Sequence, residues 1–381
     1  MIFLSTLKKG RNEMKTKVLQ SALAEANKII QPIIARDPLS KFNKVRLDVV
    51  GPNVTLCGTN GAIQIVCRFT GETEKDGILT LPGTYFNRFV SALPQGDVKI
   101  EQTGKSKVKL IGRENVNYSL PAGEAEDFAM MKTLDSGDKV EFDFSAAILR
   151  EMLRKVMFAM SKDETRSMLI GVYFEGKDGK LQMTATDGRR MAHVEKELEF
   201  TEEFALIIPA ETVKIIFSLL AKEDDADIGI AVGAERISFT AASWQVTSTV
   251  VAGKYPAWRR VVPVTVAHMA KLNRNTFIEG LERAALAADL GTMRVVEVRL
   301  ESGKATFAAE DGFASARVEI PNCVIEDGAV KTFKVDPHLV IDALKAIDDD
   351  SFTLEFNDDE SPIVLKCSIP WIAVVMPIRM K

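Results

Sequence analysis

The sequence predicts an α+β protein built from three tandem copies of one domain, each with two helices packed on antiparallel strands. Short Asx-Gly turns recur at Asn60, Asp187 and Asp311, at spacings of 127 and 124 in a chain of 381 residues. Helix-like runs that open with a proline recur at Pro82, Pro209 and Pro337, at spacings of 127 and 128. Because two independent features repeat at about one third of the chain, tandem copies are favoured over one large core.

Each third contains the same order of elements. It opens with an amphipathic helix pattern, at residues 15–30, 145–160 and 273–288. In the second of these helices the apolar face comprises Leu149, Met152, Leu153, Val156 and Met160, and in the third it comprises Phe277, Leu281, Ala284 and Leu286. The proline-led helices follow at 82–93, 209–222 and 337–347, and strand patterns come after them at 97–100, 227–230 and 351–354. Two helices on one face of an antiparallel sheet would bury both apolar stripes.

The expected domains are residues 1–137, 138–263 and 264–381. The first boundary falls in the turn-like segment Asp135-Ser136-Gly137-Asp138, and the second falls at Pro263. Each domain has the usual size for a core of its own.

Composition limits the function classes. No apolar run approaches the roughly 20 residues that a membrane span needs. The start, Met1 to Lys9, is interpreted as a first strand rather than a signal peptide, which favours the cytoplasm and no membrane partner. The cysteines form no Cys-x-x-Cys pair and are expected to be buried free thiols: Cys57, Cys67, Cys323 and Cys367. The histidines show no zinc-ligand spacing, so no metal, cofactor or catalytic group is predicted: His193, His268 and His338.

Three local motifs, in order along the chain, carry a resemblance to a known family. They are Thr186-Asp187-Gly188-Arg189-Arg190-Met191-Ala192, the segment from Gly253 to Pro263, and Val374-Val375-Met376-Pro377-Ile378-Arg379-Met380. They are similar to the Thr-Asp-Gly-His-Arg-Leu-Ala, Gly-x-Phe/Tyr-Pro-x-Tyr-x-x-Val-x-Pro and Val-Met-Pro-Met-Arg-Leu segments of the bacterial DNA polymerase III β subunits, the sliding clamps. The resemblance covers nearly the whole chain and fits the threefold repeat.

The chain departs from that pattern at several positions. Arg189 stands where the family has His, and Trp258 stands where it has Tyr. Lys381 extends the tail by one residue, and the segment before Met14, with Lys8, Lys9 and Arg11, is longer than usual. The changes at 189 and 381 are expected to affect partner preference rather than architecture.

The resemblance implies a non-catalytic processivity factor of DNA replication. Two chains would close head to tail as a homodimer, and the six-domain ring would encircle duplex DNA with helices inside. The six predicted helices carry a net charge of +6 while the chain carries −4, which suits a lining that holds phosphates without reading bases. Lys and Arg on solvated helix faces would give the same excess, and the third domain contributes none of it. The expected DNA-facing residues are Lys15, Lys17, Arg88, Arg150, Arg154, Lys155, Lys162, Arg166, Lys214 and Arg274.

A second implied site is a pocket between the second and third domains. It would bind short hydrophobic motifs of the replicative polymerase, the clamp loader and repair proteins. Apolar walls and an adaptable methionine suit Leu or Phe side chains, and arginines suit peptide carbonyls or acidic flanks. An alternative reading of residues 374–378 is a final core strand, although a proline there indicates an edge. The implied lining is Leu169, Thr186, Gly188, Arg189, Arg190, Met191, Pro256, Arg260, Val261, Val374, Val375, Met376, Pro377, Ile378 and Arg379.

The implied dimer contact joins the first domain to the third domain of the partner. Tyr118 matches an aromatic edge position of the family, and Leu286 and Ala287 match its apolar partners. Tyr118 could equally be an ordinary aromatic residue of an edge strand.

Two rival functions use the same residues. An enzyme could use Asp187 as a catalytic carboxylate with Arg189 and Arg190 as an anion clamp, and a repeat scaffold would need no DNA. The sequence contains no nucleophile–His pair, no Gly-rich phosphate loop and no metal-ligand spacing. The threefold recurrence of the Asx-Gly motif favours a structural turn over one active site.

Overall fold

The computed structural model describes residues 14–132, 134, 139–198, 202–223, 226–289, 294–325 and 330–379. The predicted strand at residues 1–9, the basic residues Lys8, Lys9 and Arg11, the boundary segment 135–138 and Lys381 lie outside these ranges. The chain forms two compact units, residues 1–144 with 226–249 and residues 145–225 with 250–381.

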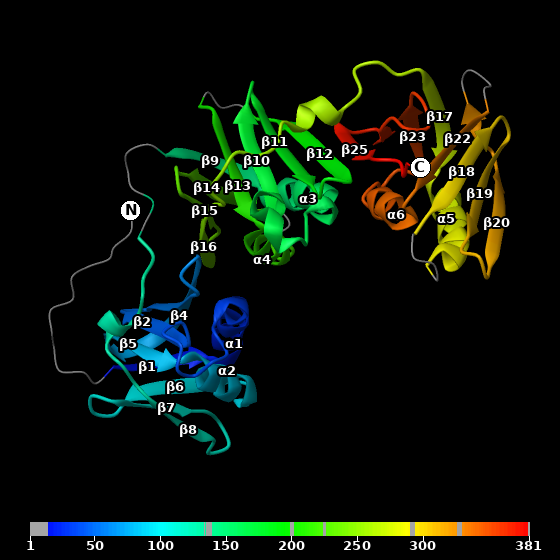
Figure 1. The fold of residues 1–381 in the computed structure, drawn as a ribbon. Helices are drawn as coiled ribbons and strands as arrows, with labels where there is room; N and C mark the ends of the chain where they lie inside the picture. Colours follow the sequence, from blue (N-terminus) through cyan, green and yellow to red (C-terminus); the bar gives the residue numbers. More distant parts are fainter. Residues whose placement is uncertain are drawn as a thin grey trace. The chain divides into compact units, whose positions relative to one another are not determined.

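The first unit contains one twelve-stranded antiparallel sheet and two helices (Figure 1). One path through the sheet runs β8-β7-β6-β1-β4-β16-β15-β14-β9, and β2, β3 and β5 branch from β4. Helix α1 packs on β3 and β4 and lies beside α2. The elements are β1 (Lys15–Leu19), α1 (Gln20–Ile30), β2 (Lys44–Val50), β3 (Asn53–Thr59), β4 (Ile63–Lys75), β5 (Gly77–Pro82), α2 (Gly83–Ala92), β6 (Asp97–Gln102), β7 (Lys107–Ile111), β8 (Asn117–Pro121), β9 (Val140–Ser145), β14 (Asp227–Val232), β15 (Arg236–Thr240) and β16 (Trp244–Thr249).

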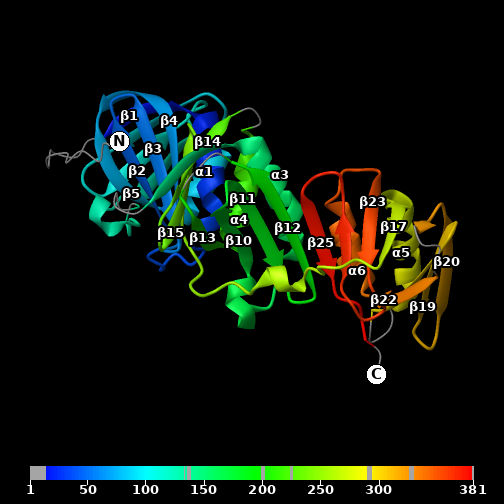
Figure 2. The same cartoon turned by 90° about the horizontal axis from the view of Figure 1, so that it is seen from above.

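The second unit contains a nine-stranded and a four-stranded sheet. The order is β13-β10-β11-β12-β25-β24-β23-β17-β21 in the larger sheet and β20-β19-β18-β22 in the smaller one. Figure 2 shows β25 lying between β12 and β23. The elements are α3 (Ala146–Val156), β10 (Gly171–Lys177), β11 (Lys180–Thr186), β12 (Arg190–Glu197), β13 (Phe204–Pro209), α4 (Ala210–Leu220), β17 (His268–Asn273), α5 (Arg274–Ala288), β18 (Val296–Glu301), β19 (Lys304–Glu310), β20 (Ser315–Pro321), β21 (Val324–Ile325), β22 (Lys331–Val335), α6 (Pro337–Lys345), β23 (Ser351–Phe356), β24 (Ile363–Lys366) and β25 (Trp371–Val375).

Strand β25 joins the second and third repeats into one sheet. It pairs with β12 on one side, where Met191 is opposite Val374, and with β24 on the other, where Val364 is opposite Val374. Helix α3 packs on β11, β12 and α4, while α5 packs on β18, β19, β20 and α6. The predicted pairs of helices on antiparallel strands are therefore confirmed, as are the strands at 97–100, 227–230 and 351–354.

The predicted first helix begins five residues too early. Residues 15–19 form strand β1, in which Thr16 and Val18 are buried while Lys15 and Lys17 point outward. This alternation has the period of a strand, and β1 pairs with both β4 and β6. The helix pattern at 15–30 was therefore two elements read as one.

The proline-led helices also begin slightly differently. Pro82 and Pro209 end strands and occupy the N-cap positions of α2 and α4, so they precede the first helical residue, whereas Pro337 is the first residue of α6. The predicted apolar face of α3 is buried throughout, but Leu286 of α5 is 72% exposed, so its assignment to an apolar core face was wrong. Three cysteines are buried as free thiols, and Cys367 is half-buried.

Candidate functional site

The Asx-Gly turn at Asp187 has the same geometry as its two counterparts. Asp187 Oδ1 accepts the backbone amides of Arg189 and Arg190 at 2.9 and 3.0 Å. Asn60 and Asp311 accept the amides two and three residues further on in the same way. The glycine that follows has a φ of +89°, +88° and +89° at Gly61, Gly188 and Gly312. This carboxylate is occupied by its own turn, which explains the recurrence of the motif without any catalysis.

The middle turn lies beside an apolar cluster that contains Met191. The cluster gathers buried side chains from β12, β13, β24, β25 and the segment that follows β16, together with Leu169. Tyr255 and Trp258 come from the linker after β16 and pack on Met191 and Val374. The buried members are Leu169, Met191, Ile207, Tyr255, Trp258, Val364 and Val374. Three predicted pocket residues, Leu169, Met191 and Val374, are thus brought together.

Aromatic stacking fixes the linker on the sheet. The Tyr255 ring stacks on Tyr173 at a centroid distance of 4.8 Å, and the Trp258 ring stacks on His193 at 4.2 Å. Arg259 lies over Trp258 and donates to Glu175 and Gln182 at 2.7 and 2.8 Å. Such stacked and ion-paired contacts hold the linker in one geometry.

Tyr255 and Trp258 were not predicted as members of this site, although both belong to the motif from Gly253 to Pro263. Their aromatic side chains, on either side of the predicted pocket residue Pro256, could have identified them as part of the site. Pro256, Arg260 and Val261 are exposed around them, and Val261 is 44% exposed.

Arg190 is fixed by three partners. Its guanidinium donates to Asp187 Oδ2 at 3.1 Å, to Asp342 Oδ2 at 2.8 Å and to the Phe158 carbonyl oxygen at 2.7 Å. The side chain is only 9% exposed. Arg190 therefore supports the turn and ties it to α6, and it leaves little of its guanidinium free for a ligand.

The last described residues run along the same turn. The Met376 amide donates to the Arg189 carbonyl oxygen at 2.9 Å, and the Ile378 amide donates to that of Lys334 at 2.7 Å. Met376 is 36% exposed, whereas Pro377 is buried. Val375 is fully buried on the sheet face opposite Val374, so its predicted place in the pocket lining was wrong, because neighbouring residues in a strand point to opposite faces.

Burial controls the titratable groups around this site. Burial lowers the pKa of His193 to about 4. Its Nδ1 lies 3.0 Å from Thr184 Oγ1, and its Nε2 lies 3.8 Å from Glu195 Oε2. Burial also raises the pKa of Tyr255 and, less strongly, that of Tyr173. At neutral pH the imidazole and both phenols are therefore uncharged. No three His, Cys, Asp or Glu side chains of the described residues come together as a metal site.

The predicted DNA-facing residues divide into two groups. Exposed or half-exposed side chains on or beside the helices are Arg88, Arg150, Arg154, Lys162, Arg166, Lys214 and Arg274. The Nε atoms of Arg150 and Arg274 find no acceptor within the described residues, and Arg150 lies over the Phe217 ring at 4.8 Å. Arg154 is bound to Glu151 and Asp348, which reduces its availability to a ligand.

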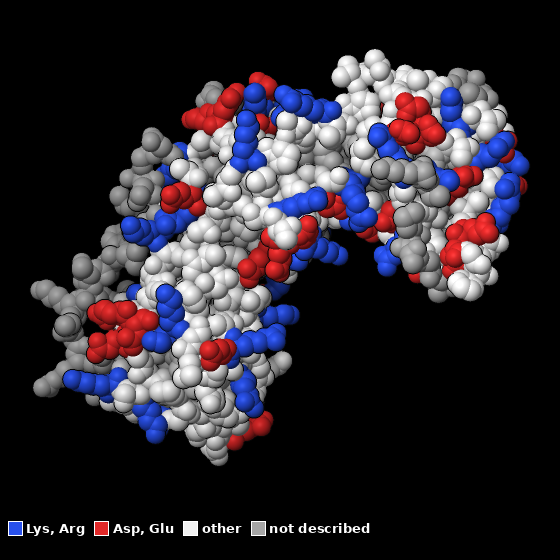
Figure 3. Space-filling view, viewed as in Figure 1, with Lys and Arg blue, Asp and Glu red and all other residues white. Residues whose placement is uncertain are grey.

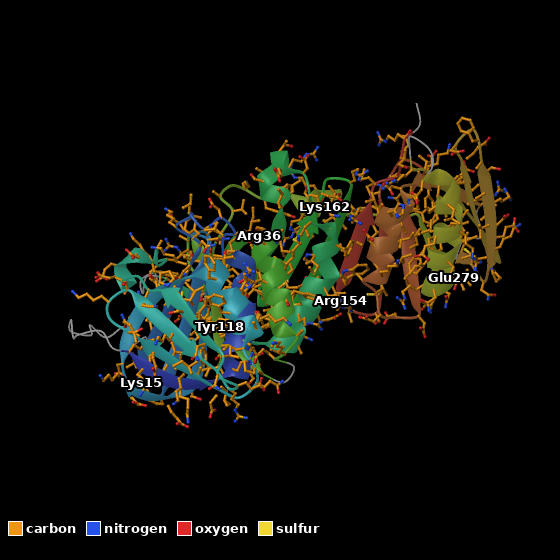
Figure 4. The ribbon with its side chains drawn as sticks, turned by 90° about the horizontal axis from the view of Figure 1, so that it is seen from below. Lys15, Arg36, Tyr118, Arg154, Lys162 and Glu279 are labelled. Carbon is orange, nitrogen blue, oxygen red and sulfur yellow. The ribbon has the colours of Figure 1, made fainter. Side chains whose placement is uncertain are left out.

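The remaining three predicted residues are not exposed on a helix. Lys15, labelled in Figure 4, lies on β1 together with Lys17. The two side chains form ion pairs with Glu74 at 2.9 Å and Glu72 at 2.6 Å. Lys155 is 1% exposed, and its Nζ lies 2.7 Å from both the Ala346 carbonyl oxygen and Asp348 Oδ2. It binds α3 to the loop after α6 rather than facing solvent.

The helices carry less positive charge than the sequence predicted. Lys15, Lys17 and Lys222 lie outside the observed helices, so the net charge of the six helices is +3 instead of +6. Figure 3 shows acidic and basic side chains interspersed over the face in view. Any DNA contact must therefore depend on particular arginines and lysines rather than on a uniformly basic surface.

The predicted dimer residues lie at two sheet edges or beside them. Tyr118 is on β8, an end strand of the first unit's sheet, and its ring stacks on Phe89 with centroids 4.4 Å apart. Leu286 is exposed on α5, which packs against the edge strand β20. Ala287 is only 5% exposed, so the prediction that it faces a partner was wrong.

No helix in the described parts of the chain is long and apolar enough to cross a lipid bilayer.

In sequence, the chain is 26% identical over 346 residues to the beta sliding clamp of Synechocystis sp., covering 84% of this chain and 86% of that protein. It is 24% identical over 352 residues to the beta sliding clamp of Staphylococcus epidermidis, and this match covers 90% of this chain and 92% of that protein.

Solved structures agree with the fold. The DNA polymerase III subunit beta of Pseudomonas aeruginosa has a TM-score of 0.90 at 23% identity, with 96% of this chain and 100% of that chain covered. The DNA polymerase sliding clamp of Bacillus subtilis has a TM-score of 0.90 at 19% identity, with 97% of this chain and 100% of that chain covered. Models for the N-terminal, central and C-terminal domains of the DNA polymerase III beta subunit match residues 13–132, 143–257 and 259–379. The chain therefore belongs to the DNA polymerase III beta subunit family.

Proposed function

We propose that this chain is a ring-forming processivity factor that encircles duplex DNA and tethers the replicative polymerase. The observation that carries the proposal is the succession of three clamp domains, matched in sequence and in fold. The family is an accessory subunit of DNA polymerase III, and this chain is not itself catalytic. We place the domains at residues 1–137, 138–263 and 264–381, and the protein acts in the cytoplasm.

A homodimer would be closed through two sheet edges. Among the strands that the structure describes, β8 and β20 each end a sheet, so each offers backbone groups on one side to pair with another chain. The Tyr118–Phe89 stack and the exposed Leu286 supply apolar contacts beside these edges. Because one edge is in the first domain and the other in the third, the contact is heterologous, and two chains close as a ring.

The DNA contact is made by individual basic side chains on and beside the helices. Arg88 and Lys214 are exposed, and Arg150 and Arg274 are half-buried. Phosphate contacts of this kind carry no sequence information, so the ring can slide. Lys162 and Arg166 extend the set through the loop after α3.

The partner site is the apolar cluster at the middle Asx-Gly turn. Leu169, Met191 and Val374 provide the apolar floor, and Met376 and Val261 remain partly exposed at its edge. A short apolar segment of a polymerase, clamp loader or repair protein would insert its Leu or Phe side chains here.

The test is retention on closed DNA. The protein is loaded on nicked circular DNA, and the same sample is then cut once with a restriction enzyme. A topological ring stays on the circle in high salt and is lost from linear DNA, whereas a protein held by charge alone dissociates from both. Equal retention on circular and linear DNA would contradict the proposal.

Charge-reversal variants test the DNA-facing set. Arg150→Glu with Lys214→Glu should weaken loading while peptide binding persists, because both residues lie apart from the cluster at the middle turn. Arg299→Glu, a change on strand β18, is the matched control, because Arg299 is half-exposed and belongs to no proposed site. Unchanged loading of the double variant would remove Arg150 and Lys214 from the DNA contact.

An enzyme is not favoured. Asp187, the candidate catalytic carboxylate, is 17% exposed and already accepts from two backbone amides and from Arg190. The same turn is built at Asn60, where no carboxylate exists. The residue therefore shapes the turn.

A further inference from the structure

Three arginines, Arg166, Arg189 and Arg190, lie at the middle turn, and they differ in how tightly their side chains are held. Arg190 is locked by three close partners and is 9% exposed. Arg189 is 68% exposed, and its ion-pair contact within the described part of the chain is at 3.6 Å, from Nη1 to Asp336 Oδ2. This separation is longer than a hydrogen bond. Arg189 thus keeps its donors available beside the pocket.

Arg166 and Arg379 are also largely exposed and have only long ion-pair contacts among the described residues. The Arg166 side chain is 56% exposed, and its Nη1 lies 2.9 Å from the position that a Cβ on Gly188 would occupy, so it reaches over the turn. Arg379 is 65% exposed, and it lies three residues beyond Met376, whose amide is bonded to the Arg189 carbonyl. Their ion pairs with Asp163 and Glu360 are both 3.5 Å long.

The acidic groups near Arg166 and Arg189 face these arginines with Oδ2 and bind other groups with Oδ1. Asp336 is 12% exposed, and its Oδ1 caps helix α6 by accepting the His338 amide. Asp163 Oδ1 accepts the amide and the hydroxyl of Thr165 at 3.0 and 2.7 Å, and these bonds lower the pKa of Asp163. These carboxylates stabilise local backbone and only partly neutralise the guanidinium groups.

We propose that this rim, with Arg189 at its centre, selects partner peptides whose apolar motif is flanked by Asp or Glu. The inference rests on the proposed peptide-binding function of the cluster and specifies the chemistry of its ligand. A guanidinium presents a planar fork that matches a carboxylate in a two-bond contact, and it stays charged at every physiological pH. The family's His at this position would lose its charge near pH 6.5. Arg189 therefore gives this chain a preference that does not depend on pH.

The experiment measures peptide binding to the full chain by fluorescence anisotropy. Three labelled probes share one Leu- and Phe-containing core and carry two flanking Asp, Asn or Lys residues. The Asp-flanked probe should bind about fivefold more tightly than the Asn-flanked probe at low salt, as expected for partly exposed charge pairs. The Lys-flanked probe should bind most weakly, and the differences should shrink in 0.5 M salt by screening, where the Debye length is under about 5 Å.

Variants assign the effect to its residue. Arg189→Glu should favour the Lys-flanked probe over the Asp-flanked one, and Arg189→His should keep a preference for Asp at pH 6 that disappears by pH 8. Arg299→Glu changes the net charge by the same amount as Arg189→Glu and should leave the order of the probes unchanged.

The outcomes separate the two proposals. Equal binding of the Asp- and Asn-flanked probes, or an unchanged order in Arg189→Glu, overturns the acidic preference and leaves the pocket in place. Failure of all three probes to bind at millimolar concentration overturns the pocket itself, and the preference with it.

Discussion

The buried ammonium of Lys155 offers a sharp test of how the second and third domains are joined. Replacing it by methionine keeps the length of the side chain and removes its charge and its donors. Lys155 Nζ lies 2.7 Å from the Ala346 carbonyl oxygen, 2.7 Å from Asp348 Oδ2 and 3.3 Å from Glu151 Oε1, and the side chain is 2% exposed. The variant therefore leaves a carbonyl on the other side of the domain junction without its donor.

The size of the effect follows from these contacts. Losing a buried hydrogen bond from a charged donor costs roughly 1.5–3 kcal/mol. The Asp348 side chain is 65% exposed and keeps Arg154 as a partner, so its ion pair adds at most about 1 kcal/mol. Because the apolar methionine side chain packs in the buried site, it offsets part of the free energy lost with the hydrogen bond and the ion pair. We therefore expect Lys155→Met to lower the unfolding free energy by about 2–3 kcal/mol. The corresponding drop in Tm is roughly 4–12 °C.

Thermal and urea unfolding followed by circular dichroism give the measurement. Lys162→Met is the control, since Lys162 is exposed six residues from the end of α3 and should change stability by less than about 0.5 kcal/mol. Lys155→Met should also load on DNA like the unmodified chain, because the ammonium is inaccessible. Stability equal to that of Lys162→Met, together with impaired loading, would refute the buried role and restore Lys155 to the DNA-facing set.

Three further predictions concern pH, thiol reactivity and the turns. Burial holds the pKa of His193 near 4, below the 6.5 of an exposed imidazole, so unfolding takes up a proton between pH 4 and pH 6.5. The unfolding free energy should therefore fall by about 3 kcal/mol as the pH drops from 7 to 4. His193→Gln should remove this fall when urea unfolding is measured across the same pH range. Burial raises the pKa of Cys57, so a disulfide reagent should modify the native protein at half-buried Cys367 and spare Cys57, as peptide mass mapping would show; modification of Cys57 at the same rate would contradict its burial. Gly188→Ala and Gly312→Ala should each cost about 1 kcal/mol in thermal unfolding, because both glycines have a positive φ, +88° and +89°, and the exposed end of Arg166 can move away from a methyl group at 188; a clearly larger loss for Gly188→Ala would show that Arg166 is held over the turn.

The repeat was readable from the sequence because it depends on local chemistry. An Asx-Gly turn needs a side chain that accepts nearby amides and a residue that tolerates positive φ, and both requirements are visible in the residue types. The turns at Asn60, Asp187 and Asp311 share their hydrogen bonds as their spacing indicated. The apolar face of α3 was predictable for the same reason, since periodicity is local.

Errors arose where distant contacts override local pattern. Lys155 occupies a helical position that looks polar, yet a carbonyl 191 residues away binds it. Lys15 and Lys17 precede a true helix, and pairing with β4 and β6 draws them into a strand. The aromatic cover supplied by Tyr255 and Trp258 depends on a linker folding back over a sheet, which spacing alone does not reveal.

The insertion of β25 between β12 and β24 has a consequence for how the protein is made. Strand β12 ends at Glu197, and its partner β25 starts at Trp371, so a ribosome must add residues 198–370 before the edge of β12 can be covered. At roughly 5–20 residues per second this takes about 9–35 s. During that interval a nascent chain exposes an unpaired apolar strand, which is a template for aggregation between neighbouring chains on one messenger RNA. Biogenesis of the second domain therefore depends on protecting that edge until the third domain has been synthesised.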